Sequence, residues 1–334
     1  MSRKNFLPYI AIAAILTLLP SVPVLAQEKK LLRVVFVSFS WNSELPFRVA
    51  MAKGYFKSQG ISIEPIFIRG GPAAIAALAS GEVDFGSIGG AQAPIRSRAR
   101  GLDISIIGSI SNKINYAIVG NKQTASIEEL KGKIIGITGA GAFSEFAVRT
   151  FLKKYNIDPD KDVTLRAIGG TPLRAAALEK GLIAAAPFSP EDAVSLIKKG
   201  FPMIINLSES LDIPQSVLIA RDELLDKYPE TSKRFLKALI LGINLAKRNK
   251  QEAIKAGYDA GLKGDPDTVS RSYDLYSSGL TSDLSIAVDG IQFMLDEDIR
   301  HGLVDKKMTL ERVINDRILK KAQEELRREG RLSP

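Results

Sequence analysis

The sequence predicts an α/β fold built from two similar halves. Runs typical of strands alternate with alanine- and leucine-rich helical stretches from Leu31 onward. The turn Gly70-Gly71-Pro72 opens an alanine-rich helix that closes at Gly81, and Gly169-Gly170-Thr171-Pro172 opens one that closes at Gly181. This short internal repeat predicts two α/β lobes that face each other. Each lobe would present helix N-termini at the carboxyl ends of its strands, where open α/β sheets bind ligands.

The first half of the chain supplies strands and helices in strict alternation. Expected strands cover 31–39, 61–68, a short stretch after 82–86, and 104–110, and expected helices cover 45–59, 73–80 and a segment ending at Arg100. Ser40-Trp41-Asn42-Ser43 and Gly89-Gly90-Ala91 are expected loops after strands.

The stretch from Lys133 to Phe151 has the pattern of an anion-binding turn. Lys133–Thr138 is a β-branched run, and Gly139-Ala140-Gly141 is a loop of small residues. A helix is expected to begin at Ser144, with Ser144 as its N-cap and Phe143 packing onto Val148. Backbone N–H groups at such a helix start have no partner within the helix and point at whatever occupies the loop.

Three interpretations of this turn stay open. The letters GAGAFS are close to the dinucleotide-binding fingerprint, but Ser144 replaces its third glycine and the ribose-binding acid expected about 20 residues later is absent. A pocket for a smaller ligand is favoured over dinucleotide binding. A turn that needs small residues only for packing is the remaining alternative.

The rest of the chain adds shorter strands and then a long helical segment. Further strands are expected at 116–119, 163–168, 204–207 and 217–220. From Asp222 the pattern is helical almost throughout. Tyr228-Pro229 opens a long amphipathic helix, and Leu310, Val313, Ile314 and Ile318 mark one face of a last helix.

The composition excludes several kinds of site. The chain has 334 residues, no cysteine and one histidine, His301. Disulfides, zinc–thiolate sites, cysteine nucleophiles and multi-histidine metal sites are excluded, and a Ser-His-Asp triad would depend on His301. The net charge of +9 comes without basic stretches that alternate with aromatic residues, so nucleic-acid binding is not expected. We expect no catalytic residue, no metal and no cofactor.

The N-terminus has the pattern of a secretory signal peptide over residues 1–26. Arg3 and Lys4 precede the apolar run Ile10–Leu19, and Val24-Leu25-Ala26 supplies small residues before Gln27. No later stretch reaches the roughly 18 apolar residues of a membrane-spanning helix. Without a cysteine to carry a lipid anchor, we expect a periplasmic protein.

Several segments in this order resemble periplasmic solute-binding proteins of ABC importers, of the nitrate/sulfonate/taurine class, to which thiamine-precursor binding proteins are related. The segments are PFRVAMAKGYFKSQGISIE, GGPAAIAALASGEVDFG, GSISNKINYAIVG, SIEELKGKIIGIT and LIARDELLDKYPETSKRFLKALILG. The resemblance implies a type II periplasmic-binding-protein fold, with two α/β lobes around a central ligand cleft. Lobe I would comprise residues 27–112 and 208–334, and lobe II residues 113–207.

The resemblance also implies a function and a set of ligand contacts. The chain would capture a small organic anion, sulfonate- or carboxylate-like, and deliver it as a monomer to an ABC permease, without catalysis. A sensor module or a binder of a neutral thiamine-precursor pyrimidine are the alternatives. The ligand-binding positions would be Ser40, Trp41, Asn42, Gly70, Gly71, Gly90, Ala91, Gln92, Gly141, Ala142, Phe143, Ser144, Phe188 and Ser189.

Individual roles follow from chemistry at these positions. Backbone N–H groups at Gly71, Ala91 and 142–144 would hold an oxyanion, and aromatic rings would cover its body. Trp41 is compatible with either the cleft or the core. Arg69 and Arg149 are candidate partners for the anion.

Overall fold

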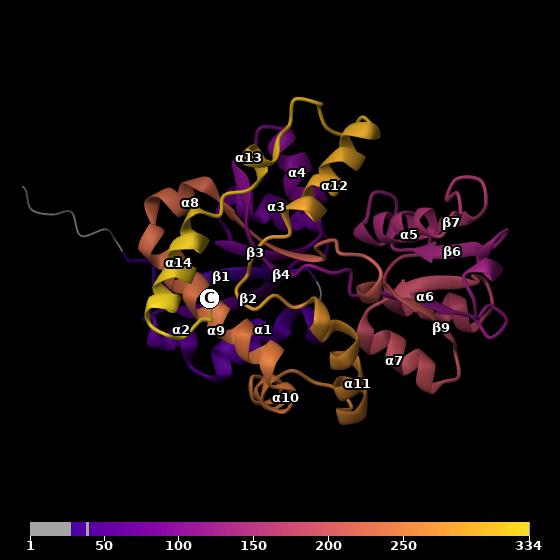
Figure 1. Cartoon of the computed structure of the whole chain (residues 1–334), viewed down its shortest axis with the longest axis horizontal. Coiled ribbons are helices and arrows are strands. Elements are labelled where there is room, and N and C mark those ends of the chain that lie inside the picture. Colours follow the sequence, from indigo (N-terminus) through magenta and orange to yellow (C-terminus); the bar gives the residue numbers. More distant parts are fainter. Residues whose placement is uncertain (1–27, 38–39, 334) are drawn as a thin grey trace, which may run out of the picture.

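The computed structural model of the chain describes residues 28–37 and 40–333. The signal peptide expected over residues 1–26 lies outside this part of the chain. Two five-stranded sheets, each flanked by helices, lie side by side along the long axis of the molecule (Figure 1). We call each sheet with its helices a lobe. The predicted α/β fold with two lobes is confirmed.

The first lobe contains strands from both ends of the chain. Its sheet has the order β2-β1-β3-β10-β4, in which β1, β2 and β3 run parallel and β10 runs antiparallel to both neighbours. The strands are β1 (Leu31–Phe36), β2 (Ser62–Phe67), β3 (Phe85–Gly89), β4 (Ile104–Ser111) and β10 (Ser216–Arg221). The helices between the strands are α1 (Trp41–Ala52), α2 (Tyr55–Ser58), α3 (Gly71–Ser80) and α4 (Gln92–Ala99).

The second lobe is made of one continuous stretch. Its sheet has the order β7-β6-β8-β5-β9, with β5 antiparallel to β8 and β9. The strands are β5 (Ala117–Gly120), β6 (Ile134–Ile137), β7 (Thr164–Ala167), β8 (Ala185–Phe188) and β9 (Met203–Asn206). The helices are α5 (Phe143–Lys154), α6 (Thr171–Glu179) and α7 (Pro190–Lys198).

The helical segment after β10 returns to cover the first lobe (Figure 1). It comprises α8 (Asp222–Lys227), α9 (Pro229–Arg248), α10 (Lys250–Asp259), α11 (Pro266–Tyr276), α12 (Val288–Arg300), α13 (Leu310–Val313) and α14 (Arg317–Arg328). The buried face of α9 brings Phe235 onto Phe85 of the sheet, with ring centroids 4.1 Å apart. Among the described residues, no helix combines the length and apolar character needed to cross a membrane.

Several helix boundaries differ from the sequence-based predictions. The expected loop 40–43 is instead the start of α1, which begins at Trp41. The expected helix over 45–59 is interrupted at Gly54, whose left-handed φ of 68° separates α1 from α2. The expected last helix is broken between α13 and α14, because the Asn315 N–H donates to the carbonyl of Ile106 in β4 at 2.9 Å.

Two crossover segments join the lobes and lie side by side. Residues 112–116 lead from β4 to β5, and residues 207–215 lead back from β9 to β10. The Gln215 N–H donates to the Ser111 carbonyl at 3.1 Å, and the Ile114 N–H donates to the Leu211 carbonyl at 3.3 Å. These bonds tie the two crossovers into one narrow connection.

The lobes also meet through helices on both sides of this connection (Figure 1). Helix α5 meets α12 through the rings of Phe146 and Phe293, whose centroids are 6.2 Å apart. On the other side, Lys198 of α7 pairs with Asp265 before α11 at 2.7 Å and with Asp267 at 2.8 Å. The two lobes therefore contact each other across both edges of their interface.

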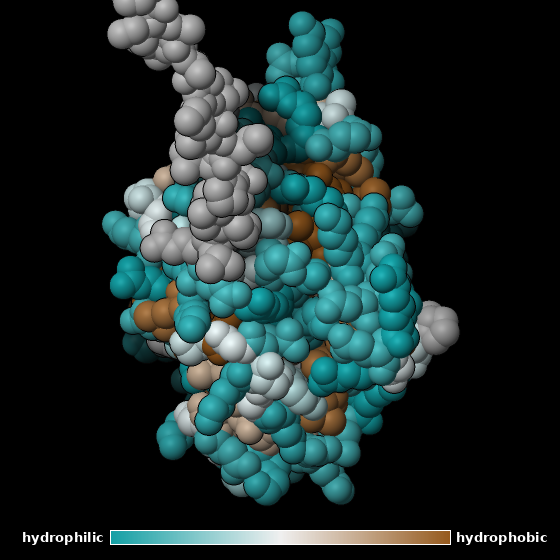
Figure 2. Space-filling view, turned by 90° about the vertical axis from the view of Figure 1, so that its left-hand side faces the viewer, coloured by the Kyte–Doolittle hydropathy of each residue, from teal (hydrophilic) through white to brown (hydrophobic). Residues whose placement is uncertain are grey.

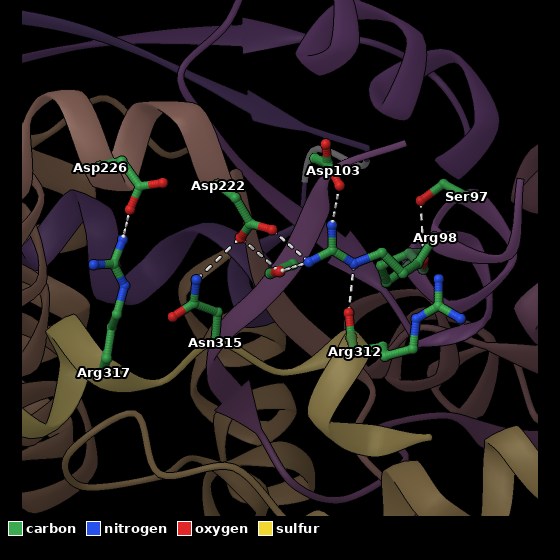
Figure 3. A network of polar contacts seen from close by, with 10 residues as sticks. Ser97, Arg98, Asp103, Asp222, Asp226, Arg312, Asn315 and Arg317 are labelled. Carbon is green, nitrogen blue, oxygen red and sulfur yellow. Dashed lines mark hydrogen bonds and ion pairs between the residues drawn. The ribbon is translucent and has the colours of Figure 1, made fainter. Parts of the chain in front are cut away.

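The far end of the first lobe presents a polar surface. Figure 2 shows hydrophilic residues over most of this face, with hydrophobic residues gathered in separate patches. In the same lobe, the side chain of Arg98 from α4 joins several segments (Figure 3). It donates to Asp103 at 2.7 Å, to Ser105 at 2.9 Å, and also to Asp222 and the Arg312 carbonyl. This network attaches the C-terminal helices to the sheet.

Asp222→Asn is expected to lower the free energy of unfolding at pH 7 by about 1–3 kcal/mol. Burial raises the pKa of Asp222, but hydrogen bonds from Asn315, Arg98 and Ser105 outweigh this effect and lower it below the usual value. The carboxylate therefore adds stability above its unfolded pKa of about 3.9, and this contribution is lost as the pH falls through the lower folded pKa. Urea unfolding of the wild type and the variant at several pH values in this range measures the effect. The difference between their free energies of unfolding should become smaller as the pH falls.

Asp226→Asn is the matched control, because Asp226 pairs with Arg317 at the surface beside the network (Figure 3). Exposed pairs of this kind contribute about 0–1 kcal/mol. Equal effects of the two substitutions, or a difference between wild type and Asp222→Asn that does not change with pH, would contradict the role assigned to Asp222.

Candidate functional site

Loops and helix starts that follow three strands of the first lobe meet those that follow three strands of the second. After β1, the Asn42 N–H donates to Glu191 Oε1, which follows β8, at 3.2 Å. After β2, Arg69 Nη1 lies 3.8 Å from the position that a Cβ on Gly170 would take, after β7. We call this meeting place of strand-end loops the interlobe site.

The third contact joins Gly90, after β3, to Phe143, after β6. A Cβ on Gly90 would lie 2.5 Å from Phe143 Cδ2 and equally close to Gln92 Oε1, so no other residue fits there without displacement. The φ of Gly90, 70°, also favours glycine. The carboxyl ends of the parallel strands of both sheets therefore face each other, as the sequence predicted.

Arg174 is the buried cation of the interlobe site. It projects from α6, is 3% exposed, and lies over the ring of Phe188 with 5.7 Å from Cζ to the ring centroid. Its guanidinium donates to Thr138 Oγ1 at 2.7 Å and to the Gly169 carbonyl at 2.6 Å. It also reaches the Pro187 carbonyl at 3.3 Å and Thr171 Oγ1 at 3.3 Å. All these acceptors lie at or just beyond the carboxyl ends of β6, β7 and β8.

Every acceptor of Arg174 is neutral. Among the described residues, no carboxylate lies within ion-pair distance of Arg174. One of the two N–H groups on Nη2 also has no acceptor among these residues. Burial lowers the pKa of Arg174, and the negative charge of Asp192 opposes this effect. Since an arginine stays charged in proteins, the site holds a buried positive charge that an anion would compensate.

The two arginines proposed from the sequence have different surroundings. Arg149 pairs with Glu145 at 2.9 Å and Asp160 at 2.7 Å, so its charge is already compensated. Arg69 is exposed and points across to Gly170. Arg96 lies near Gly141 but pairs with Asp298 at 2.7 Å. Sequence reasoning missed Arg174, although it replaces Ala74 when the two glycine-bounded helices are aligned on Gly81 and Gly181.

The predicted N-cap of α5 is wrong. The helix begins at Phe143, and Ala142 occupies the cap position without a side-chain hydrogen bond. Ser144 lies inside the first turn, where its hydroxyl accepts the Thr138 N–H at 3.0 Å and so anchors the end of β6. Phe143 packs between Tyr116 and Phe146, with centroid distances of 6.0 and 5.9 Å. Gly141, with φ of 73°, donates its N–H to Glu145 at 2.6 Å.

Trp41 belongs to the core of the first lobe. It is 4% exposed, and its indole N–H donates to the Lys263 carbonyl at 2.8 Å. Its ring stands edge-on to Tyr258 of α10, with centroids 4.9 Å apart. The indole is therefore directed at α10, and the tryptophan fluorescence reports on this packing.

The other predicted positions differ in what their polar groups contact. Gln92 is 7% exposed, and both polar atoms of its side chain lack partners among the described residues. The Ala91 N–H donates to Met294 Sδ at 3.3 Å. Ser40 caps α1 through its carbonyl, and Ser189 at the start of α7 donates to Asp192 Oδ2 at 2.5 Å. Gly70 and Gly71 precede and open α3.

Two other features do not form a competing site. A surface hollow of about 580 Å³ on α10 and α11 contains Lys250 and Lys255, which pair with Asp274 and Asp259. The side chain of His301 is exposed beside Glu297. In the part of the chain that the structure describes, no group of three or more His, Asp or Glu side chains is placed to hold a metal ion.

Comparison with protein families assigns the chain. A family model described as "NMT1/THI5 like" matches residues 41–253, which include loops of both lobes. The chain belongs to the NMT1/THI5 like family.

Curated proteins similar to this NMT1/THI5 like chain are mostly named binding proteins. A putative binding protein of Brucella abortus is 26% identical over 261 residues, which cover 76% of this chain and 77% of the relative. A putative aliphatic sulfonates-binding protein of Bacillus subtilis is 25% identical over 291 residues, with 84% and 85% covered. An enzyme of Candida albicans, 4-amino-5-hydroxymethyl-2-methylpyrimidine phosphate synthase, is 32% identical over 126 residues, or 36% of each chain.

Solved structures show the same fold. The periplasmic aliphatic sulphonate binding protein of Escherichia coli superimposes with a TM-score of 0.71 at 16% identity, covering 88% of this chain and 100% of that one. The periplasmic nitrate-binding protein of Synechocystis gives a TM-score of 0.69 at 14% identity, covering 90% and 89%. The NMT1/THI5 like chain therefore has the periplasmic-binding-protein fold that the sequence predicted.

Proposed function

We propose that the chain is an extracytoplasmic solute-binding protein that captures a small organic anion at the interlobe site and delivers it to the permease of an ABC importer. Arg174 is the observation that carries this proposal. A buried cation that contacts only neutral acceptors is costly unless a ligand supplies the opposite charge. The named functions of the relatives, sulfonate and nitrate binding among them, point to the same class of ligand.

The mechanism that fits this arrangement is capture by closure, without a chemical step. A ligand between the strand-end loops contacts both lobes only when they are close together, so its binding favours the closed arrangement. The narrow double crossover is a suitable hinge, with residues 113–207 as the moving unit. The free Nη2 N–H of Arg174 would bind an oxygen of the anion. The organic part would lie beside this guanidinium, which covers the fully buried ring of Phe188.

Thermal unfolding of the ligand-free mature chain with added solutes tests the proposal. The panel comprises alkanesulfonates, carboxylates, nitrate, bicarbonate and neutral pyrimidines. We expect an organic anion to raise the melting temperature with concentration, because ligand at 100 times its Kd stabilises the folded state by about 2.7 kcal/mol. A response to neutral pyrimidines alone would replace the anion by the thiamine-precursor alternative. If calorimetry shows no response of the protein to any anion of the panel, neither bound ligand nor a shifted melting temperature, the proposed function is contradicted.

A further inference from the structure

Helix α7 of the second lobe contacts the first lobe at both of its ends. At its start, Glu191 accepts the Asn42 N–H at the beginning of α1, at 3.2 Å. At its end, Lys198 reaches the first turn of α11. Because a helix rises 1.5 Å per residue, Lys198 lies about 10 Å along the axis from Glu191. The second contact is therefore remote from the strand-end loops that form the interlobe site.

The ammonium group of Lys198 is directed entirely at the first lobe. Its Nζ lies 2.7 Å from Asp265 Oδ2, 2.8 Å from Asp267 Oδ2 and 2.8 Å from Thr268 Oγ1. An ammonium group has three N–H donors, so each donor has one acceptor across the interface. Hydrogen bonds to Asp265 and Asp267 raise the pKa of Lys198, and the bond to Lys198 lowers the pKa of Asp265. Both groups therefore stay charged at neutral pH.

The first turn of α11 holds these acceptors in place by its own hydrogen bonds. Asp265 is the N-cap residue, and its Oδ2 accepts the Thr268 N–H at 2.9 Å and the Thr268 hydroxyl at 2.7 Å. Among the described residues, Lys198 is the ion-pair partner of Asp265, and Asp267 has only the distant Arg271, at 3.9 Å, besides Lys198. This acidic turn therefore finds its close cation in the opposite lobe.

Other lysines at or near the interface make weaker or internal contacts. Lys199, the next residue, pairs with Glu179 of its own lobe at 2.8 Å. On the opposite edge of the interface, Lys153 of α5 pairs with Glu297 of α12 at 3.3 Å. Separation of the lobes at the α7 edge must break all three contacts of Lys198 at once, whereas the contact of Lys199 would remain.

We propose that Lys198 and the first turn of α11 form a latch that holds the two lobes closed before any ligand binds. Opening about the crossovers withdraws Lys198 from its three acceptors and leaves the bonds within each lobe unchanged. Since the latch lies outside the interlobe site, it favours the closed arrangement independently of the ligand. This inference rests on the proposed function only in treating residues 113–207 as a unit that moves about the crossovers.

Distances between spin labels in the ligand-free mature chain test the latch. The chain has no cysteine, so Leu182→Cys in the second lobe and Gln251→Cys in the first direct labels to two exposed positions. Double electron–electron resonance then gives the ratio of closed to open molecules. We expect the closed distance as a major population without ligand. Lys198→Gln should lower the ratio by about threefold or more, because it removes a network of ion pairs rather than a single exposed pair.

Lys199→Gln is the matched control, since it removes the same charge from the neighbouring residue, whose ion pair lies within the second lobe. It should keep the wild-type ratio. Asp267→Asn should lower the ratio when Lys198 is present but not in combination with Lys198→Gln, because the two residues act through one contact. A general loss of stability would not produce this dependence of one substitution on the other.

Equal ratios in wild type and Lys198→Gln, or equal losses in Lys198→Gln and Lys199→Gln, would overturn the latch. A labelled wild-type chain that is entirely open without ligand would overturn it as well. These measurements contain no ligand, so they are independent of the anion panel, in which the proposed function can fail while the latch stands. Melting temperatures of the labelled variants show whether they are folded.

Discussion

Replacing Arg174 by leucine is expected to weaken the binding of organic anions by roughly 30- to 4000-fold, which corresponds to about 2–5 kcal/mol. The substitution removes the buried positive charge and the Nη2 donor at the carboxyl ends of β6, β7 and β8. The leucine side chain can pack on Phe188, so the apolar part of the site is retained. Calorimetric titration of the anion that binds wild type most tightly measures the loss.

The stability of the ligand-free variant separates binding from folding. Leucine forfeits the hydrogen bonds to Gly169 and Pro187, but it also removes a buried charge that has no carboxylate partner. Because replacement of a buried charge by an apolar group is often neutral or stabilising, we expect the free energy of unfolding to change by less than about 2 kcal/mol. Affinity should therefore fall far more than stability.

Arg166→Leu is the control for net charge, since Arg166 lies exposed on β7 of the same lobe. We expect it to change affinity by less than about threefold, as expected for a solvent-screened charge. Arg174→Lys should be intermediate, because a lysine retains the charge but not the planar fork. Unchanged anion affinity in Arg174→Leu would remove the main support for the anion as ligand.

Gly242→Ala is expected to destabilise the protein by about 3 kcal/mol, although alanine is the better helix former by about 1 kcal/mol. Gly242 lies where α9 crosses α1. A Cβ there would lie 2.4 Å from the Pro46 carbonyl oxygen and 2.8 Å from the Ala50 Cβ. One of these atoms belongs to the backbone of α1 and the other is bonded directly to it. Neither can move away by a side-chain rotation, so the two helices must separate. The midpoint of urea unfolding measures the effect.

Gly139→Ala provides the comparison, because no heavy atom lies within 4 Å of the corresponding Cβ position. The loop glycine should tolerate the methyl group with a change below about 0.5 kcal/mol. If Gly242→Ala unfolds at the same urea concentration as wild type, then α1 and α9 do not approach as closely as described. The prediction concerns the core of the first lobe and is independent of the proposed ligand.

The sequence predicted the strands well because their signals are local. The runs starting at Ile61, Ile104 and Val217 each gave a strand within one or two residues of its observed bounds. The start of α5 was predicted wrongly because the Ser144 hydroxyl has a second use, the bond to the Thr138 N–H. A cap preference is local, whereas this bond depends on where the end of β6 lies.

The candidate site was predictable only as a set of loops. Contacts such as Asn42 with Glu191 join residues far apart in sequence, and no periodicity reports them. Trp41 was equally ambiguous, because its partners Lys263 and Tyr258 belong to the distant helical segment. Arg174 left one signal in the sequence, a single positive charge within an alanine-rich helix. Its burial and its neutral acceptors became apparent only in three dimensions.

The position of β10 sets the order in which the two halves can be completed during synthesis. The second sheet uses consecutive strands and has all of them once Asn206 is available. In the first sheet β10 lies between β3 and β4, so these two strands cannot be joined until Arg221 has emerged. Until then their edges lack their partner strand. We expect the half that contains the N-terminus to be finished last.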